Sequence, residues 1–255
     1  MVKERCRVYS VVSVGVVVLA WHLVSTFVLH PFFLPSPLSV IKGAIELTGK
    51  GTLLPFIGIS LVRIFSGWVL GSLVAVPIGL LVGWSRTVRS VVDPFIHFLR
   101  FIPAISLVTL FIVWFGVGET SKILLIAYAT GFIIMVNTAT GVGAIPDEKI
   151  NAARCLGANG RSLFLHVIVP ATLPHVYVGM RLAMASSFLV IVGAEMLAAN
   201  SGVGYLIWTS RLWFRTDWVF TGIVILGLLG RTADRAWRLV GATLMAKYVR
   251  QVARY

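Results

Sequence analysis

Apolar residues are grouped in long runs, separated by short segments rich in Gly, Pro or charged residues. The runs cover approximately residues 8–29, 56–84, 95–115, 123–142, 173–198 and 218–245. Each is near or above the roughly 20 residues that a helix needs to cross a bilayer. They are continuous and do not alternate with polar positions, which argues against the strands of a membrane β-barrel. The pattern predicts an all-α, polytopic membrane protein, a single domain over residues 1–255 with about six transmembrane helices.

The segment between the first two runs has a different pattern. Prolines at positions 31, 35 and 37 end the first helix, and residues 38–48 have the apolar spacing of a short amphipathic helix, which we expect outside the bilayer. The first run follows Lys3, Arg5 and Arg7, as the apolar part of a secretory signal would. At about 22 residues it is too long for that part, and no small-x-small cleavage site follows. It is therefore expected to be retained as a span.

Composition supports a membrane location. Hydrophobic residues make up 58% of the 255-residue chain and charged residues 12%, about half the charged fraction of an ordinary soluble domain. The formal net charge is +13, from 22 Lys and Arg against 9 Asp and Glu. In a soluble protein this charge would indicate a nucleic-acid partner, but here the cations lie mainly between apolar runs. We therefore expect no nucleic-acid partner and interpret the cations as determinants of membrane orientation.

The distribution of Lys and Arg predicts the side of the membrane on which each loop lies, because cytoplasmic loops carry an excess of both. With the N-terminus inside, fourteen cations fall on the cytoplasmic side: Lys3, Arg5, Arg7, Arg86, Arg89, Lys149, Arg154, Arg161, Arg231, Arg235, Arg238, Lys247, Arg250 and Arg254. Five fall on the opposite side: Lys42, Lys50, Lys122, Arg211 and Arg215. Both termini are therefore predicted to be cytoplasmic.

One cytoplasmic segment, residues 143–172, is much longer than the others. It begins with Pro146, Asp147 and Glu148, a good helix start because acidic side chains lie near the positive end of the helix dipole. Gly157 and Gly160 then interrupt the helix, and a second short apolar helix is expected up to residue 170. Two short helices that meet at a glycine corner form a compact knob. Its few charges suit insertion into a groove on another protein.

The same segment resembles the EAA loop of ABC-importer permeases, the binding-protein-dependent inner-membrane components. The family pattern is Glu-Ala-Ala, three residues, Gly, nine residues, then Ile-x-Leu-Pro. This chain has Asn151-Ala152-Ala153, Gly157 and Val167-Ile168-Val169-Pro170 at the same spacing. Asn151 replaces the family's glutamate, and Glu148, one helical turn earlier, is a candidate to supply that carboxylate.

Further stretches extend the resemblance over nearly the whole chain, most closely to the taurine, alkanesulfonate, nitrate and bicarbonate branch. They are Phe33-Leu34-Pro35-Ser36-Pro37, Arg89-Ser90-Val91-Val92-Asp93-Pro94, Arg100-Phe101-Ile102-Pro103, Trp114-Phe115-Gly116-Val117-Gly118-Glu119-Thr120-Ser121-Lys122, Gly193-Ala194-Glu195-Met196-Leu197 and Gly202-Val203-Gly204. The resemblance implies a type I ABC importer fold in the cell inner membrane. It implies a second, identical permease copy, two cytoplasmic ATPase subunits and an extracytoplasmic binding protein that delivers a small anion such as a sulfonate, nitrate or bicarbonate.

The resemblance also implies that the knob couples the permease to the ATPase. The residues expected at that contact are Asp147, Glu148, Asn151, Ala152, Ala153, Gly157 and Gly160. ATP and Mg²⁺ are then bound by the partner, since this chain has no Gly-x-x-x-x-Gly-Lys-[Ser/Thr] loop. The chain is expected to be a transport subunit with no cofactor of its own, and not an enzyme.

Polar residues within the apolar runs are candidates for the translocation pathway, because ionisable groups are costly in a bilayer. The candidates are Arg100, Ser106, Thr109, Asn137, Ser186, Ser187 and Glu195. Arg100 could attract an anion or extend toward lipid phosphates, and the second option also applies to Arg63. For Glu195 a structural ion pair or a helix-end contact is favoured over substrate contact, since a carboxylate repels an anion. Arg181 is expected to be structural or near the inner gate.

Other kinds of chemistry have little support. The five histidines form no His-x-x-x-His or His-Glu-x-x-His array, so no metal site is expected. Scattered His, Asp and Glu residues give no catalytic cluster for a membrane-embedded enzyme. The knob argues against a passive channel, which needs no ATPase. Within the family, the alternative to an anion permease is one for a neutral heterocycle such as a thiamine or riboflavin precursor.

Overall fold

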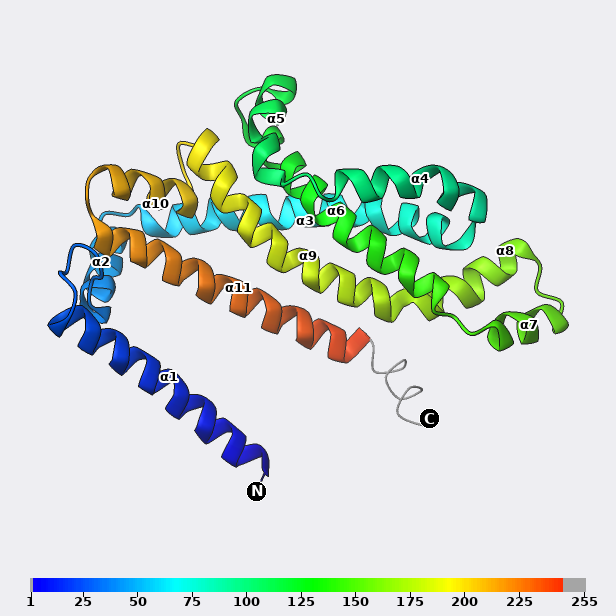
Figure 1. Ribbon diagram of the computed structural model, residues 1–255, viewed down its shortest axis with the longest axis horizontal. Coiled ribbons are helices and arrows are strands. Elements are labelled where there is room, and N and C mark those ends of the chain that lie inside the picture. Colours follow the sequence, from blue (N-terminus) through cyan, green and yellow to red (C-terminus); the bar gives the residue numbers. More distant parts are fainter. Residues whose placement is uncertain (1, 245–255) are drawn as a thin grey trace. The chain divides into compact units, whose positions relative to one another are not determined.

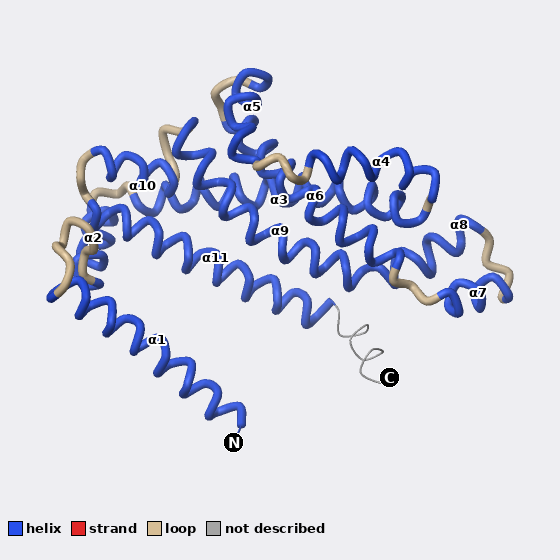
Figure 2. Tube along the Cα trace, viewed as in Figure 1, coloured by secondary structure: helices blue, strands red, loops and turns tan. Residues whose placement is uncertain are grey.

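The computed structural model describes residues 2–244, and in this part of the chain every regular element is a helix (Figures 1 and 2). The helices are α1 (Val2–Phe27), α2 (Pro37–Gly49), α3 (Leu53–Trp84), α4 (Arg86–Leu99), α5 (Val108–Phe115), α6 (Glu119–Gly143), α7 (Asp147–Cys155), α8 (Gly160–Leu163), α9 (Val169–Ala198), α10 (Val203–Leu212) and α11 (Thr216–Leu244). A 3₁₀ turn covers Ala104–Leu107 and a π turn covers Phe164–Ile168. The predicted all-α fold is confirmed.

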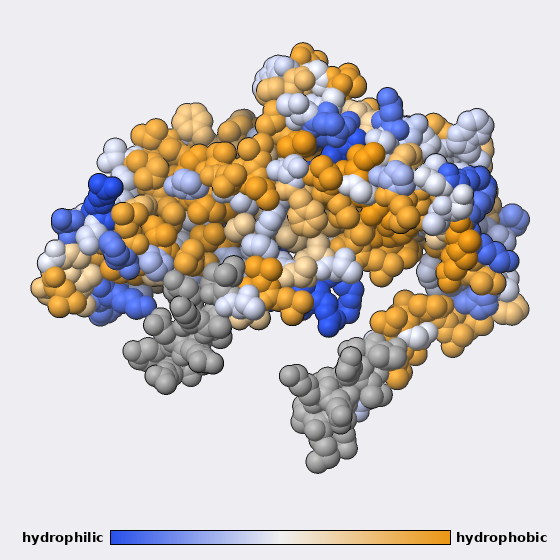
Figure 3. Space-filling model, turned by 180° about the vertical axis from the view of Figure 1, so that it is seen from behind, coloured by the Kyte–Doolittle hydropathy of each residue, from blue (hydrophilic) through white to orange (hydrophobic). Residues whose placement is uncertain are grey.

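Three stretches in residues 2–244 are long and apolar enough to cross a membrane: α3, α6 and the continuous helix Gly160–Ala198. If the bent pair formed by α4 and Ala104–Phe115 is counted as one span, the number of such stretches rises to four. The apolar part of α1, Val12–Phe27, is shorter, and the charged α11 is not among them. Hydrophobic residues cover most of the face shown in Figure 3, as expected for helices in lipid. The count of six spans stays a prediction. The last residue of the sixth predicted span, residue 245, lies outside the described residues, as do Lys247, Arg250 and Arg254.

The third apolar run, residues 95–115, does not form the single helix that the pattern predicts. It contains the end of α4, a break at residues 100–103, and the helical stretch Ala104–Phe115, which is bent by 86° relative to α4. Pro103 explains the break, because proline has no backbone N–H and disfavours helical geometry at the residue before it. The apolar pattern identifies the run but not the interruption within it.

The fifth apolar run also differs from its prediction, which placed a separate short helix before a span that starts at residue 173. The observed helix is continuous from Gly160 to Ala198. The π turn Phe164–Ile168 makes this possible: Val169 N–H donates to Phe164 O, and Pro170, which has no N–H, follows directly in the first turn of α9. The knob is therefore α7, its following turn and the start of this long helix.

The described residues form two compact units, residues 2–59 with 201–227 and residues 60–200 with 228–244. In the first, Leu47, Leu53 and Leu206 form a buried cluster that holds α2, which confirms the short helix expected over residues 38–48. Arg215 Nη2 lies 2.7 Å from the Glu46 carboxylate. Hydrogen bonds from Arg215 and Lys50 lower the pKa of Glu46 to about 2. The carboxylate is therefore ionised at neutral pH.

In the second unit, α3 packs against α6 along a stripe of small residues at four-residue spacing. The stripe is Gly67, Gly71, Ala75, Gly79 and Gly83. A Cβ at Gly67 would lie 2.5 Å from Ile126, and one at Gly83 would lie 2.5 Å from Val142. Small residues let two helices approach closely where lipid provides no hydrophobic driving force between them. The stripe thus fixes the close α3–α6 packing on which the rest of this unit is built.

The stripe leads to a stability prediction for Gly79→Ala. A Cβ there would lie 2.7 Å from Met135 O, which is backbone and cannot move aside easily. We expect a loss of about 1–3 kcal/mol, the usual cost of overpacking. Gly58→Ala in the same helix meets nothing within 4 Å and should be neutral or slightly stabilising. Thermal unfolding in detergent checks both variants, and equal melting temperatures for the two would contradict close packing at Gly79.

Candidate functional site

The knob carries all of the predicted coupling residues on an exposed part of the second unit. Six of them are exposed on α7 and the residues that follow it, and Ala153 is half-buried. Helix α7 begins at Asp147, directly after Pro146, as the sequence predicts. Leu156, which follows α7, is 89% exposed. The Leu156 side chain is thus accessible to another protein.

The backbone at the end of α7 forms a Schellman motif. Ala158 N–H donates to Ala153 O at 3.0 Å and Gly157 N–H donates to Arg154 O at 2.9 Å. Gly157 has φ +88°, a left-handed conformation that side chains with a Cβ rarely adopt. Asn159 then begins α8, because its side chain accepts a hydrogen bond from Ser162 N–H. The corner between the two helices is therefore a defined structure and not a loose loop.

The knob is attached to the core of the second unit by apolar contacts. Leu80 on α3 and Val142 on α6 belong to a buried cluster, against which Ile150 of α7 and Phe164 of the π turn pack. The rings of Phe164 and Trp84 lie 6.0 Å apart. A force applied at the knob therefore reaches α3, α6 and α9 through packed side chains, as a rigid-body movement requires.

A buried ionic cluster joins the same three helices elsewhere in the unit. Arg63 on α3 is 2% exposed, and its Nη1 lies 2.7 Å from Oε1 of Glu195 on α9, which is fully buried. Arg63 Nη2 also donates to Glu119 Oε1, at the start of α6, at 2.7 Å. Ser60 Oγ donates to Glu195 at 2.8 Å, and Lys122 Nζ lies 3.1 Å from Glu119. Two cations thus meet two carboxylates. The side chains of Arg63, Glu195 and Lys122 are buried, whereas that of Glu119 is 55% exposed. The buried charges are satisfied in pairs.

This cluster bears on two of the alternatives left open by the sequence. The structural ion pair favoured for Glu195 is present. Extension of Arg63 toward the membrane surface is wrong, because its side chain is buried between carboxylates. Arg181 Nε on α9 lies 2.6 Å from the carboxylate of Asp234 on α11, which supports its structural interpretation.

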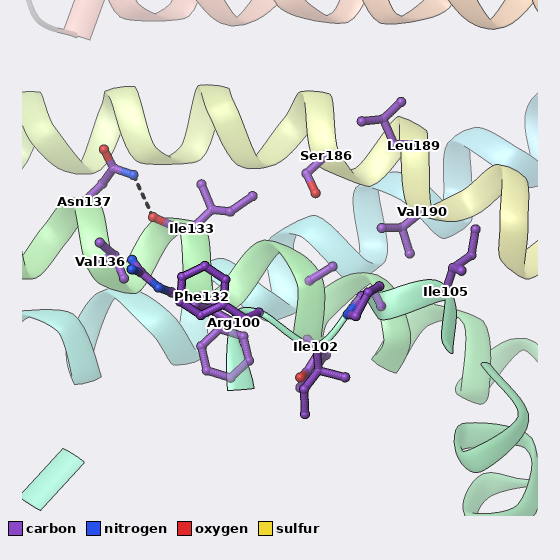
Figure 4. A pocket seen from close by; sticks show the side chains of 15 residues that line it. Arg100, Ile102, Ile105, Phe132, Ile133, Val136, Asn137, Ser186, Leu189 and Val190 are labelled. Atoms are coloured by element: carbon purple, nitrogen blue, oxygen red, sulfur yellow. Dashed lines mark hydrogen bonds between the residues drawn. The ribbon is translucent and has the colours of Figure 1, made fainter. Parts of the chain in front are cut away.

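A cavity of about 590 Å³ lies between α6, α9 and the broken segment that follows α4 (Figure 4). It brings together three of the seven predicted pathway residues, Arg100, Asn137 and Ser186. The other four, Ser106, Thr109, Ser187 and Glu195, do not line it. Ser106 and Ser187 donate to backbone oxygens of their own segments, Pro103 O and Met184 O. The assignment of all seven to the pathway stays a prediction.

Several residues that organise these sites were not among the sequence candidates. Ser60 and Lys122 complete the ionic cluster, and Tyr128 Oη donates to Leu99 O at the break after α4. The small-residue stripe of α3 is the one such feature that could have been recognised in the sequence, by its four-residue spacing. The contacts of Ser60, Lys122 and Tyr128 depend on which helix faces pack together. Over residues 2–244, no group of three His, Cys, Asp or Glu residues is placed to hold a metal ion.

Comparison with known proteins agrees with this architecture. The family described as "Binding-protein-dependent transport system inner membrane component" matches residues 67–242. The taurine transport system permease protein of Escherichia coli is 32% identical, over 86% of this chain and 82% of that protein. The nitrate import permease protein of Synechococcus elongatus is 31% identical, over 91% of this chain and 87% of that protein.

Solved structures share the fold at lower sequence identity. A chain of the inward-facing MetNI methionine ABC transporter has a TM-score of 0.63 at 18% identity and covers 74% of this chain and 95% of its own length. A chain of an amino acid ABC transporter has a TM-score of 0.58 at 18% identity, with 84% and 97% covered. The fold is therefore that of type I ABC importer permeases, and this chain belongs to the family of binding-protein-dependent transport system inner membrane components.

Proposed function

We propose that this chain is the pathway-forming subunit of an ATP-driven importer for a small anion. Two copies of it would assemble with two cytoplasmic ATPase subunits, which bind ATP and Mg²⁺, and receive substrate from an extracytoplasmic binding protein. Both termini would be cytoplasmic. The observation that carries the proposal is the knob: an exposed helix with a defined glycine corner, fixed by apolar packing to a cluster that includes α6, one of the helices that line the cavity beside Arg100.

The proposed coupling follows from this attachment. A groove on an ATPase subunit would hold α7 and the exposed Leu156. Movement of that subunit on ATP binding would then displace α3, α6 and α9 together, because Ile150 and Phe164 pack on a cluster formed by these helices and their junctions. Alternating access needs two such arrangements of the helices around one substrate path.

A small anion is favoured as the substrate for two reasons. Relatives across most of the chain are named for taurine transport and nitrate import, and a sulfonate group and nitrate share a compact, negatively charged set of oxygen atoms. The cavity also presents one cation, Arg100, and no carboxylate among its lining residues. Both observations point to an oxyanion and away from a neutral heterocycle.

Uptake by the reconstituted complex tests the proposed function. The permease, the ATPase subunit and the binding protein from the same gene neighbourhood are placed in proteoliposomes loaded with ATP on the ATPase side. We expect ATP-dependent accumulation of at least one member of a panel of ethanesulfonate, taurine, nitrate and bicarbonate. Accumulation of thiamine or riboflavin precursors without any of these anions would overturn the anion assignment, and uptake without ATP would overturn the coupling.

A further inference from the structure

Arg100 differs from Arg63 and Arg181 by its lack of a carboxylate partner. Arg63 pairs with Glu195 at 2.7 Å and Arg181 pairs with Asp234 at 2.6 Å. No carboxylate of the described chain forms an ion pair with Arg100, whose guanidinium instead lies 4.8 Å from the centre of the Phe101 ring. An unpaired cation in an apolar run is costly and is normally found where it faces water or a ligand.

The surroundings of Arg100 supply neutral hydrogen-bonding groups and no opposing charge. Asn137 on α6 and Ser186 on α9 line the same cavity (Figure 4). Asn137 Nδ2 donates one hydrogen bond to Ile133 O at 2.7 Å, which leaves its second N–H and its side-chain oxygen for a ligand. The Ser186 hydroxyl has no partner among the described residues and is half-buried. Together the three residues offer a cation and two neutral donors.

The position of Arg100 is held by the break in the third run. Tyr128 Oη on α6 donates to Leu99 O at 2.8 Å, which fixes the end of α4 against α6. On the other side of the break, Ile105 lies directly against Gly193 of α9, where a Cβ would collide with the Ile105 side chain. The segment that carries Arg100 is thus held between α6 and α9. The interruption at Pro103 therefore places a cation, Arg100, beside the cavity.

The buried ionic cluster complements this arrangement. Glu195 is the single carboxylate of α9, and Arg63 and Ser60 hold it in a fully buried position. Its charge is compensated there and it does not line the cavity. An anion in the cavity therefore meets Arg100 without a facing carboxylate.

We infer that Arg100, Asn137 and Ser186 form a transit site for one oxyanion group, which Arg100 selects by charge. A sulfonate or nitrate would accept hydrogen bonds from the guanidinium, the Asn137 amide and the Ser186 hydroxyl. Guanidinium groups suit this task because their donors match planar arrays of oxygen atoms. A cavity of about 590 Å³ lies within the usual size range of small-molecule sites. The inference rests on the proposed function, and it names the residues that would make the importer selective for an anion.

The test compares charge variants in the reconstituted complex with ethanesulfonate and nitrate as probes. Arg100→Gln should lower the uptake rate at least about tenfold, since hydrogen bonds to a charged group are stronger than those between neutral groups. Arg100→Lys retains the charge and should keep most of the uptake. Ser186→Ala should lower uptake by about twofold to tenfold. ATP hydrolysis stimulated by the binding protein should stay at the wild-type level in all three variants, because the coupling knob is unchanged.

Arg89→Gln is the matched control. Arg89 lies on α4, pairs with Asp93 at 3.4 Å and does not line the cavity, so its loss should leave uptake unchanged. Wild-type uptake in Arg100→Gln, or equal losses in Arg100→Gln and Arg100→Lys with ATP hydrolysis intact, overturns the transit site while the proposed function stands. If Arg100→Gln fails to assemble, unchanged uptake in Ser186→Ala overturns it. A wild-type complex that moves no anion overturns the proposed function instead.

Discussion

Gly157→Val is expected to lower ATP-dependent uptake at least about tenfold while the chain still inserts into the membrane. Gly157 has φ +88°, and a β-branched residue is a strong outlier in that region. The Schellman motif around Gly157 would open to relieve the strain, and Leu156 and Ala158 would change direction. No atom lies within 4 Å of a Cβ at this position. The substitution therefore causes no steric clash that would unfold the rest of the chain. The measurements are uptake by proteoliposomes and co-purification of the ATPase subunit.

Two further glycine variants separate backbone conformation from bulk. Gly157→Asn adds a side chain but tolerates the left-handed conformation, so it should retain more uptake than Gly157→Val unless the docked ATPase approaches Gly157 closely. Gly143→Ala, at the end of α6, also meets nothing within 4 Å and has no positive φ, and it should behave as wild type. Normal uptake and normal ATPase association in Gly157→Val would refute the role given to the knob.

Arg63→Met is expected to cause the largest loss of stability of any single change considered. It leaves Glu195 fully buried without its cation and removes a bond to Glu119. Breaking a buried ion pair by removing one partner costs about 3–5 kcal/mol, a large part of the total stability of an ordinary domain. We expect a much lower yield of folded protein and a clearly lower melting temperature in detergent.

A double variant shows whether the effect of Arg63→Met comes from the uncompensated charge. Arg63→Met with Glu195→Gln removes both charges of the pair and should be more stable than Arg63→Met alone. Lys50→Met is the exposed control: Lys50 pairs with Glu46 at 2.8 Å but is 52% exposed, so its loss should cost at most about 1 kcal/mol. If Arg63→Met melts at the wild-type temperature, the cluster does not hold α3, α6 and α9 together.

The sequence predicts the helices well because apolar runs and proline or glycine boundaries are local properties. α2 and α7 begin within a residue or two of their expected starts. The two errors come from proline used in different ways. Pro103 ends a helix and bends the chain, whereas Pro170 is tolerated in the first turn of α9, after a π turn. Both prolines follow apolar residues, so the local sequence does not distinguish them. Whether the helix breaks or continues at each proline depends on tertiary packing.

The candidate sites were predictable to different extents for a similar reason. The knob residues are contiguous in the chain, so their spacing is visible directly, and they occupy one exposed corner. Arg63, Glu119 and Glu195 are separated by tens of residues and meet only because the small-residue stripe brings α3 against α6. Glu119 lies at the start of α6, and its ion pair with Arg63 could not be predicted without knowing which helix faces pack together.

Photocrosslinking from the knob tests whether this segment contacts the ATPase subunit. A benzoylphenylalanine placed at Leu156, which is 89% exposed, should form a crosslink to the ATPase subunit in membranes that contain the complete complex. The same residue placed at Phe33, which is 71% exposed in the segment between α1 and α2, should not reach the ATPase. A product of the permease with the ATPase subunit at Leu156 and none at Phe33 is the predicted result. A complex that still transports its substrate but gives no ATPase crosslink from Leu156 would contradict the account.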